Sequence, residues 1–403
     1  MGLAMGKLDI PFRSISQKLF RYICSLHQPG ERFPYPLQSG QKGSLFGTVF
    51  ACYVAYLLGR VQELPDQKPI VDTILSLRQS ETGLFIDLDL RPEHFVNINA
   101  HSEFYVKLQT TIFCYACLDA LGVNVDKKIK WLEPLLVRSE LEAWLTDLDW
   151  KNPWLVSNLD MFVGIFLFQW YNMYPDEVRI CDAIEAYFSW HDRHQDRATG
   201  FWGDQSDLLN AMAGAYHILI HYDFASRSIK YVEKIIDATL SLVCRDGLFV
   251  YGGGGGSCED MDAIDILVRC SMLTQHRADD VKEVLLKAAA ILATGQTCEG
   301  GFSWRVQPSL SDLLIYPFGK EFIAGRIYDF AYKSFRRSHY ISEHFYSSLK
   351  LYPYAINKAD TWSSWFRPLS LAFIAKRYPE NFTEPCNWRF PTWPGLGFNP
   401  FLR

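Results

Sequence analysis

The segment Gln195-Asp-Arg-Ala-Thr-Gly200-Phe-Trp202 returns in altered form along the chain and gives the strongest indication of its architecture. The related signatures are Gln79–Phe85, Asp246–Phe249 and Gln296–Trp304. Gly200 and Gly247 are 47 positions apart, and Gly247 and Gly300 are 53 apart, a spacing that suits one helical hairpin per repeat. A glycine after a helix allows a turn with positive φ, the ring packs the turn, and the glutamine can cap backbone groups.

Helical segments of two kinds alternate between these turns. One kind is apolar around most of its circumference and is expected to form inner helices. These segments are Ser44–Gly59, Asn99–Leu121, Pro153–Tyr174, Gln205–Tyr222, Cys258–Thr274 and Thr361–Tyr378. The other kind has one apolar stripe and a charged face, which is typical of outer helices. These segments are Gln67–Arg78, Asp126–Glu142, Asp176–Asp192, Ser228–Val243 and Asp279–Leu292. The alternation predicts an all-α fold, an (α/α)6 toroid of inner and outer helices.

Composition agrees with a single folded domain over residues 1–403. The chain is 49% hydrophobic and 21% charged, which leaves no room for large disordered segments. A core of about residues 38–380 contains the repeats. Residues 305–360 interrupt the rhythm and are expected to be an insertion before the last inner helix. The proline-rich residues 385–403 are expected to form an extended tail on the surface.

Charge and hydropathy exclude several classes of partner. A net charge of -5 offers no basic stripe for nucleic acid. No apolar run reaches the ~20 residues that a membrane-spanning helix needs, and no signal peptide is visible, so any membrane contact would be peripheral. Ten scattered cysteines fit a reducing cytoplasm. The sequence leaves the oligomeric state open.

The start of the fifth inner helix is the strongest candidate for a catalytic site. It follows five consecutive glycines and presents acidic groups at Glu259, Asp260, Asp262 and Asp265. Cys258, Asp262 and Asp265 share one helix face, which could point into the central cavity. Carboxylates held close together raise one another's pKa, so that one can act as an acid. The alternative is that the first acidic residues only cap the helix and complement its dipole.

Polar residues at other inner-helix starts complete the candidate site, because the helix N-termini converge at one mouth of a toroid. His101 and Glu103 are candidate proton-transfer partners. The candidate substrate-binding residues, beside Cys258, are Asn158, Asp160, Asp207, Asn210, Trp362, Trp365 and Arg367. The two rings of Trp362 and Trp365 and the cation of Arg367 could hold a sugar, a carboxylate or a phosphate. The alternative is that they form an ordinary aromatic helix junction.

The glycine-aromatic turns resemble the QW-type repeats of squalene cyclases and the related repeats of protein prenyltransferase β subunits. Asp260-Met261-Asp262-Ala263 also resembles part of the Asp-x-Asp-Asp acid motif of squalene-type cyclases, with Ala263 and Ile264 in place of the motif's last Asp and the following Thr. The resemblance implies an α/α toroid and an isoprenoid substrate that is protonated by the acidic cluster. No Asp-x-Cys zinc pair opens this helix, so zinc and protein prenyltransferase activity are not expected. An acidic cluster could also hold Mg²⁺.

Two other functions stay open from the residues. The polar helix starts also suit a carbohydrate-active hydrolase, lyase or epimerase that uses paired carboxylates. A non-catalytic binding scaffold is the third alternative, because a fold does not determine a function.

Overall fold

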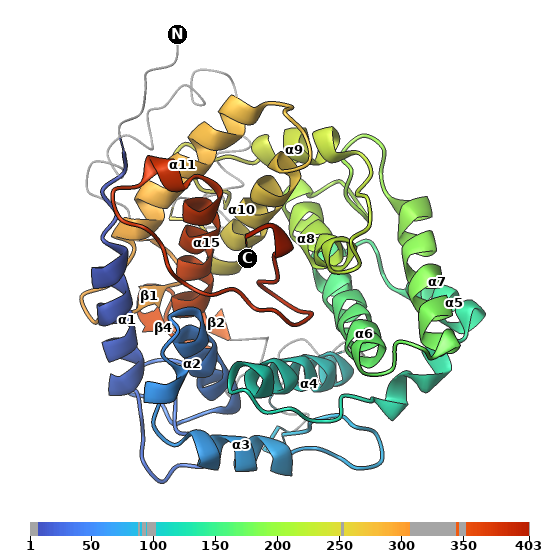
Figure 1. Ribbon diagram of the computed structural model, residues 1–403, viewed down its shortest axis with the longest axis horizontal. Coiled ribbons are helices and arrows are strands. Elements are labelled where there is room, and N and C mark those ends of the chain that lie inside the picture. The colour runs from blue at the N-terminus through green and yellow to red at the C-terminus, as the bar shows by residue number, and fades with distance from the viewer. Residues whose placement is uncertain are drawn as a thin grey trace.

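The computed structural model describes residues 7–87, 89–90, 94, 102–250, 254–306, 344–345 and 352–402. The chain is mostly helical over these ranges, which confirms the all-α prediction. Figure 1 shows one group of helices near the middle of the view and a second group outside them. The central helices are α2 (Leu45–Leu57), α4 (Ser102–Ala120), α6 (Pro153–Met173), α8 (Leu208–Phe224), α10 (Ser257–Ser271) and α15 (Ser363–Arg377). The peripheral helices are α1 (Phe12–Ser25), α3 (Gln67–Ser76), α5 (Arg138–Asp147), α7 (Val178–His194), α9 (Val232–Leu240) and α11 (Ala278–Thr294).

The central helices pack against one another in chain order. Contacts join α2 to α4, α4 to α6, α6 to α8, α8 to α10 and α10 to α15, and α15 also contacts α2. Each of them overlaps one of the apolar segments singled out in the sequence, and almost every described residue of α2, α10 and α15 is buried. Their apolar circumference is explained by this burial on several sides.

Local capping sets where several central helices begin. The Ser44 hydroxyl accepts a hydrogen bond from the Gly47 amide at 3.1 Å, and the Asn152 side chain accepts one from the Leu155 amide at 3.4 Å. Asp207 accepts from the Asn210 amide at 3.3 Å. Each cap satisfies a backbone donor that has no partner within its helix.

The peripheral helices differ from expectation at two places. The predicted helix over Asp126–Glu142 is instead the 3₁₀ helix η3 (Lys130–Leu136) followed by α5. Pro134 lies inside η3 and lacks the amide that a continuous α-helix would need. Helix α1 was not predicted, and it packs against α2.

The glycine-aromatic turns have the predicted backbone conformation. Gly83, Gly200, Gly247 and Gly300 have φ of +79°, +77°, +84° and +97°. The side-chain amide of Gln195 donates to the Gly200 carbonyl at 2.8 Å, and that of Gln296 donates to the Gly300 carbonyl at 2.7 Å. The glutamine of the signature therefore closes its own turn.

Short strands lie before α15. Strand β1 (Phe302–Ser303) pairs antiparallel with β4 (Ala359–Asp360), and β2 (His344–Phe345) pairs antiparallel with β3 (Pro353–Tyr354). Most of the predicted insertion, residues 307–343 and 346–351, lies outside the described residues. Two further 3₁₀ helices in the described ranges are η1 (Val61–Glu63) and η6 (Pro379–Asn381). None of the helices described is both long enough and apolar enough to cross a membrane.

The C-terminal segment is packed against the central helices, so the expectation of a surface tail is wrong. Its chain ends near the middle of the view in Figure 1, after the 3₁₀ helix η7 (Pro400–Leu402). The rings of Trp393 and Tyr56 are 4.8 Å apart, and Phe398 lies 4.9 Å from Phe224. Because aromatic residues follow the prolines, the segment buries apolar area that a solvent-exposed tail would leave in water.

Candidate functional site

Helix α10 carries the predicted acidic cluster and is buried along most of its length. Asp260, Asp262 and Asp265 are all buried, and Glu259 is half-buried. Ionised carboxylates are costly to bury unless they are paired or hydrogen-bonded, so the partners of each one decide what it can do.

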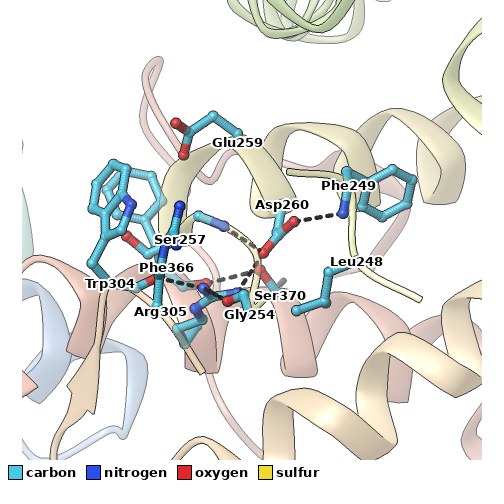
Figure 2. A network of polar contacts seen from close by, with 12 residues as sticks. Leu248, Phe249, Gly254, Ser257, Glu259, Asp260, Trp304, Arg305, Phe366 and Ser370 are labelled. Carbon is cyan, nitrogen blue, oxygen red and sulfur yellow. Dashed lines mark hydrogen bonds and ion pairs between the residues drawn. The ribbon is translucent and has the colours of Figure 1, made fainter. Parts of the chain in front are cut away.

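Asp260 is the centre of a hydrogen-bond network that fixes the start of α10. Its carboxylate accepts from the amides of Phe249 at 2.9 Å and Gly256 at 3.0 Å, and from Arg367 Nη1 of α15 at 2.6 Å. The other Arg367 amino group, Nη2, donates to the carbonyls of Gly254 and Trp304. Figure 2 shows Asp260 turned toward Phe249 and the Gly254 loop, whereas Glu259 points away from this network. Asp260 and Arg367 are both fully buried and are paired with each other, so this ion pair has a structural role in linking α15 to the start of α10.

Asp265 is also held in an ion pair. It pairs with Arg269 one turn later in α10, and its other oxygen accepts from the Asn399 side-chain amide at 2.9 Å. Arg269 also pairs with Asp223 at the end of α8 and donates to the Phe398 carbonyl at 3.1 Å. This cluster fastens the C-terminal segment to α8 and α10.

Asp262 differs from both neighbours because its carboxyl group has an unsatisfied oxygen. The Oδ2 atom is buried and has no hydrogen-bond partner among the described residues. Burial raises the pKa of Asp262 well above its usual range, and the negative charges of Glu259, Asp265 and Asp260 raise it further. Such a carboxyl group stays protonated where an exposed one would ionise.

The Tyr216 phenol of α8 and the Cys258 thiol lie near Asp262. Burial raises the pKa of Tyr216, and the nearby carboxylates Asp265 and Asp262 add to that shift. Burial raises the pKa of Tyr105 of α4, and the neighbouring Cys258 adds to that shift. The Cys258 thiol donates to Glu259 Oε2 at 3.2 Å. The predicted residues Cys258, Glu259 and Asp262 are therefore brought together.

Asp160 lies apart from this cluster, against the peripheral helix α7. Its Oδ1 is 3.2 Å from Nε2 of His191, and both side chains are fully buried. His221 lies close by, where its ring stacks on Phe168 and contacts Tyr187 edge-on. Asp160 is thus part of a buried polar cluster between α6, α7 and α8.

These buried histidines predict a loss of stability in acid. Burial lowers the pKa of both His217 and His221 to about 3. An unfolded histidine titrates near 6.5, so between those values the unfolded chain binds protons that the folded chain does not. Each of the two is expected to lower the free energy of unfolding by up to about 1.4 kcal/mol per pH unit as pH falls through this window.

Urea unfolding followed by tryptophan fluorescence between pH 4 and 8 checks this expectation. Burial raises the pKa of Asp360 to about 7. Such buried carboxylates make the folded chain more stable as the pH falls, so the histidine effect must be measured as a difference between variants. The stability of the wild type relative to His221→Gln should fall as the pH drops. His221→Phe, which keeps a ring on Phe168, should flatten the profile equally. Parallel pH profiles for all three proteins would rule out the effect.

The remaining polar candidates on α6 and α8 hold helix ends. Asp207 caps α8, and Asn210 accepts from the Trp154 amide at 2.7 Å and donates to Asn152 at 3.1 Å. Asn158 donates to the Trp154 carbonyl within its own helix at 2.8 Å. These contacts link the starts of α6 and α8.

The two tryptophans of α15 belong to an aromatic cluster. Trp362 lies 4.9 Å from Phe50 and 4.5 Å from Phe366, measured between ring centroids. Trp365 is buried and lies 5.0 Å from Tyr53. Tyr53 and Trp365 line a small apolar pocket together with the C-terminal residues Trp393 and Leu396.

Two candidates fall outside the part of the chain that the structure describes. They are His101 and the side chain of Glu103. Within the described ranges, no group of three or more His, Cys, Asp or Glu side chains is arranged to hold a metal ion.

Sequence reasoning missed the cations that neutralise the acidic cluster. Arg269 follows Asp265 at the i,i+4 spacing of a helical ion pair, which the sequence could have revealed. Arg367 was noted as a binding residue, but its pairing with Asp260 joins helices 107 positions apart. The role of Asn399 could not be recognised from the sequence, because it lies in a segment that was expected to be a tail on the surface.

Comparison of the chain with protein-family models, with curated proteins and with solved structures finds no match.

Proposed function

We propose that the chain is a single α/α toroid similar to those of squalene cyclases and prenyltransferase β subunits. The order of contacts among the central helices, which leads from α2 through α15 back to α2, supports this proposal. The recurring turns at Gly83, Gly200, Gly247 and Gly300 support it as well.

We further propose that the protein acts on an isoprenoid substrate, with Asp262 as the proton donor. The observation that carries this proposal is the buried Asp262 carboxyl group, whose Oδ2 has no partner among the described residues and whose pKa is raised. In contrast, Asp260 pairs with Arg367, Asp265 pairs with Arg269, which Asp223 shares, and both carboxylates position the helix. Asp262 is therefore the acid that remains available.

The proposed step begins with transfer of the Asp262 proton to one carbon of a carbon–carbon double bond. The π electrons form the new C–H bond, the other carbon becomes a carbocation, and the Asp262 carboxylate is left behind. Loss of a proton from the rearranged cation to solvent water gives the neutral product, and a proton taken up from solvent restores the Asp262 carboxyl group. The ring of Tyr216 near the acid, and that of Tyr105 near Cys258, would stabilise positive charge. Glu259 lies near Asp262 and provides a further acidic group.

The aromatic surroundings favour an isoprenoid over a sugar. Trp362 and Trp365 pack with Phe50, Phe366 and Tyr53, so they contribute to an apolar cluster. An apolar pocket lining suits a hydrocarbon chain, whereas a sugar needs convergent polar groups as well. We place the reaction in the cytoplasm, in keeping with ten free cysteines.

A substrate panel tests the proposal. Purified protein is incubated separately with squalene, farnesyl diphosphate, geranylgeranyl diphosphate and oligosaccharides, with and without Mg²⁺. Products are analysed by mass spectrometry. We expect a rearranged product from an isoprenoid only. Turnover of an oligosaccharide would favour the carbohydrate-active alternative, and the absence of turnover in every arm would favour a binding scaffold.

A further inference from the structure

A cleft on the surface of the molecule, separate from α10, gathers cationic side chains. It encloses about 460 Å³ between the end of α3 with its following turn and the segment that precedes η3. The residues that line it are Leu75, Arg78, Ser80, Gly83, Asp126, Lys128 and Lys130. The volume lies within the range of small-molecule sites.

The backbone at the base of this cleft is closely packed. Gly83 has φ +79°, and a Cβ atom there would lie 2.7 Å from the Lys128 carbonyl oxygen. The Tyr115 hydroxyl donates to the Gly83 carbonyl at 3.2 Å, which ties the turn to α4. The two walls of the cleft are thus held together before any ligand arrives, which reduces the entropy cost of binding.

The cationic side chains of the cleft can donate hydrogen bonds to a ligand. Arg78 lines the cleft with a half-buried side chain, whose Nε atom is itself buried and whose guanidinium lies 6.0 Å from the centre of the Tyr115 ring. The Lys128 ammonium lies 3.8 Å from Glu133, beyond hydrogen-bond distance, and 4.8 Å from the Trp170 ring. Lys130 is exposed. A guanidinium and two ammonium groups provide the donors that oxyanions accept.

Charge indicates the class of ligand. Three cations lie opposite the Asp126 carboxylate, which lines the cleft, and the Glu133 carboxylate, 3.8 Å from Lys128, so one positive charge is left over. One Asp126 oxygen already accepts from the Lys128 amide at 2.9 Å. A phosphate monoester presents three strong acceptor oxygens, which match the donors of three cationic side chains better than the two oxygens of a carboxylate do. We propose that the cleft binds the phosphate group of a phosphorylated small molecule.

Calorimetric titration with inorganic phosphate, at physiological ionic strength, tests this proposal. We expect saturable binding that weakens at least about tenfold in Arg78→Gln and in Lys130→Gln, because each loses a charge-assisted hydrogen bond. Lys68→Gln is the matched control, since Lys68 is an exposed cation in the first turn of α3 and does not line the cleft. Its affinity should equal that of the wild type.

Thermal unfolding of each variant shows whether the fold is kept, and Lys130, being exposed, can be replaced without disturbing the core. An acetate titration and sedimentation with phosphatidic acid vesicles complete the design. Vesicle binding that is lost in Lys130→Gln would assign the phosphate to a lipid headgroup, and binding of soluble phosphate alone would assign it to a soluble ester. The proposal is overturned if the wild type binds no phosphate or binds acetate as tightly as phosphate. It is also overturned if both cleft variants bind phosphate as tightly as the wild type.

Discussion

Arg367→Met is expected to lower the free energy of unfolding by about 3–5 kcal/mol, since it leaves a buried carboxylate without its counter-charge. Asp260 would keep only its two backbone donors, and the carbonyls of Gly254 and Trp304 would lose Arg367 Nη2. Urea unfolding at pH 7 measures the change. The arginine joins α15 to the start of α10, so the loss should affect the whole cooperative transition.

A second substitution distinguishes an unpaired charge from a simple packing defect. Adding Asp260→Asn to Arg367→Met removes the stranded carboxylate and should restore part of the lost stability. Arg277→Met is the control, because Arg277 pairs with Asp280 at the surface, where an ion pair contributes about 0–1 kcal/mol. If Arg367→Met were no more destabilising than this control, the network would have no structural importance.

Asp262→Asn is expected to reduce product formation by about a hundredfold or more, which is the usual contribution of a positioned proton donor. The same change should raise stability at neutral and higher pH. Because the pKa of Asp262 is raised in the folded state, the stability it contributes is present below the unfolded pKa and is lost as pH rises through the folded pKa. An asparagine does not ionise, so the stability of the variant relative to the wild type should grow as the pH increases.

Product analysis with the active substrate and urea unfolding at several pH values measure the two effects together. Asp279→Asn, an acidic residue in the first turn of the peripheral helix α11, is the matched control and should change neither quantity appreciably. Full activity in Asp262→Asn would remove the basis for a proton-donor role, even if stability rises as expected.

Helical periodicity predicted the central helices because their signal is local. Segments such as Pro153–Tyr174 are apolar on nearly every face, and the structure has α6 at Pro153–Met173. Where one residue interrupts the pattern, prediction was less successful, as Pro134 shows by dividing Asp126–Glu142 into η3 and α5. The buried C-terminal segment could not be recognised because its contacts, such as Gly397 to Tyr216, involve distant residues.

The acidic cluster shows the limit of reasoning from spacing alone. The i, i+4 and i+7 positions correctly place Cys258, Asp262 and Asp265 along one helix, but spacing does not reveal their partners. Asp265 pairs within the helix and with Asn399, which is 134 positions away. Only coordinates distinguish it from Asp262, whose Oδ2 is unsatisfied among the described residues.

Helix α2 meets α15 only late in synthesis. Leu57, the last residue of α2, and Ser363, the first of α15, are 306 positions apart. At translation rates of about 5–20 residues per second, roughly 15 to 60 seconds pass between the synthesis of α2 and that of α15. During this time Phe50 and Tyr53 lack the tryptophans that later cover them. We therefore expect the nascent chain to need chaperones until α15 has been synthesised.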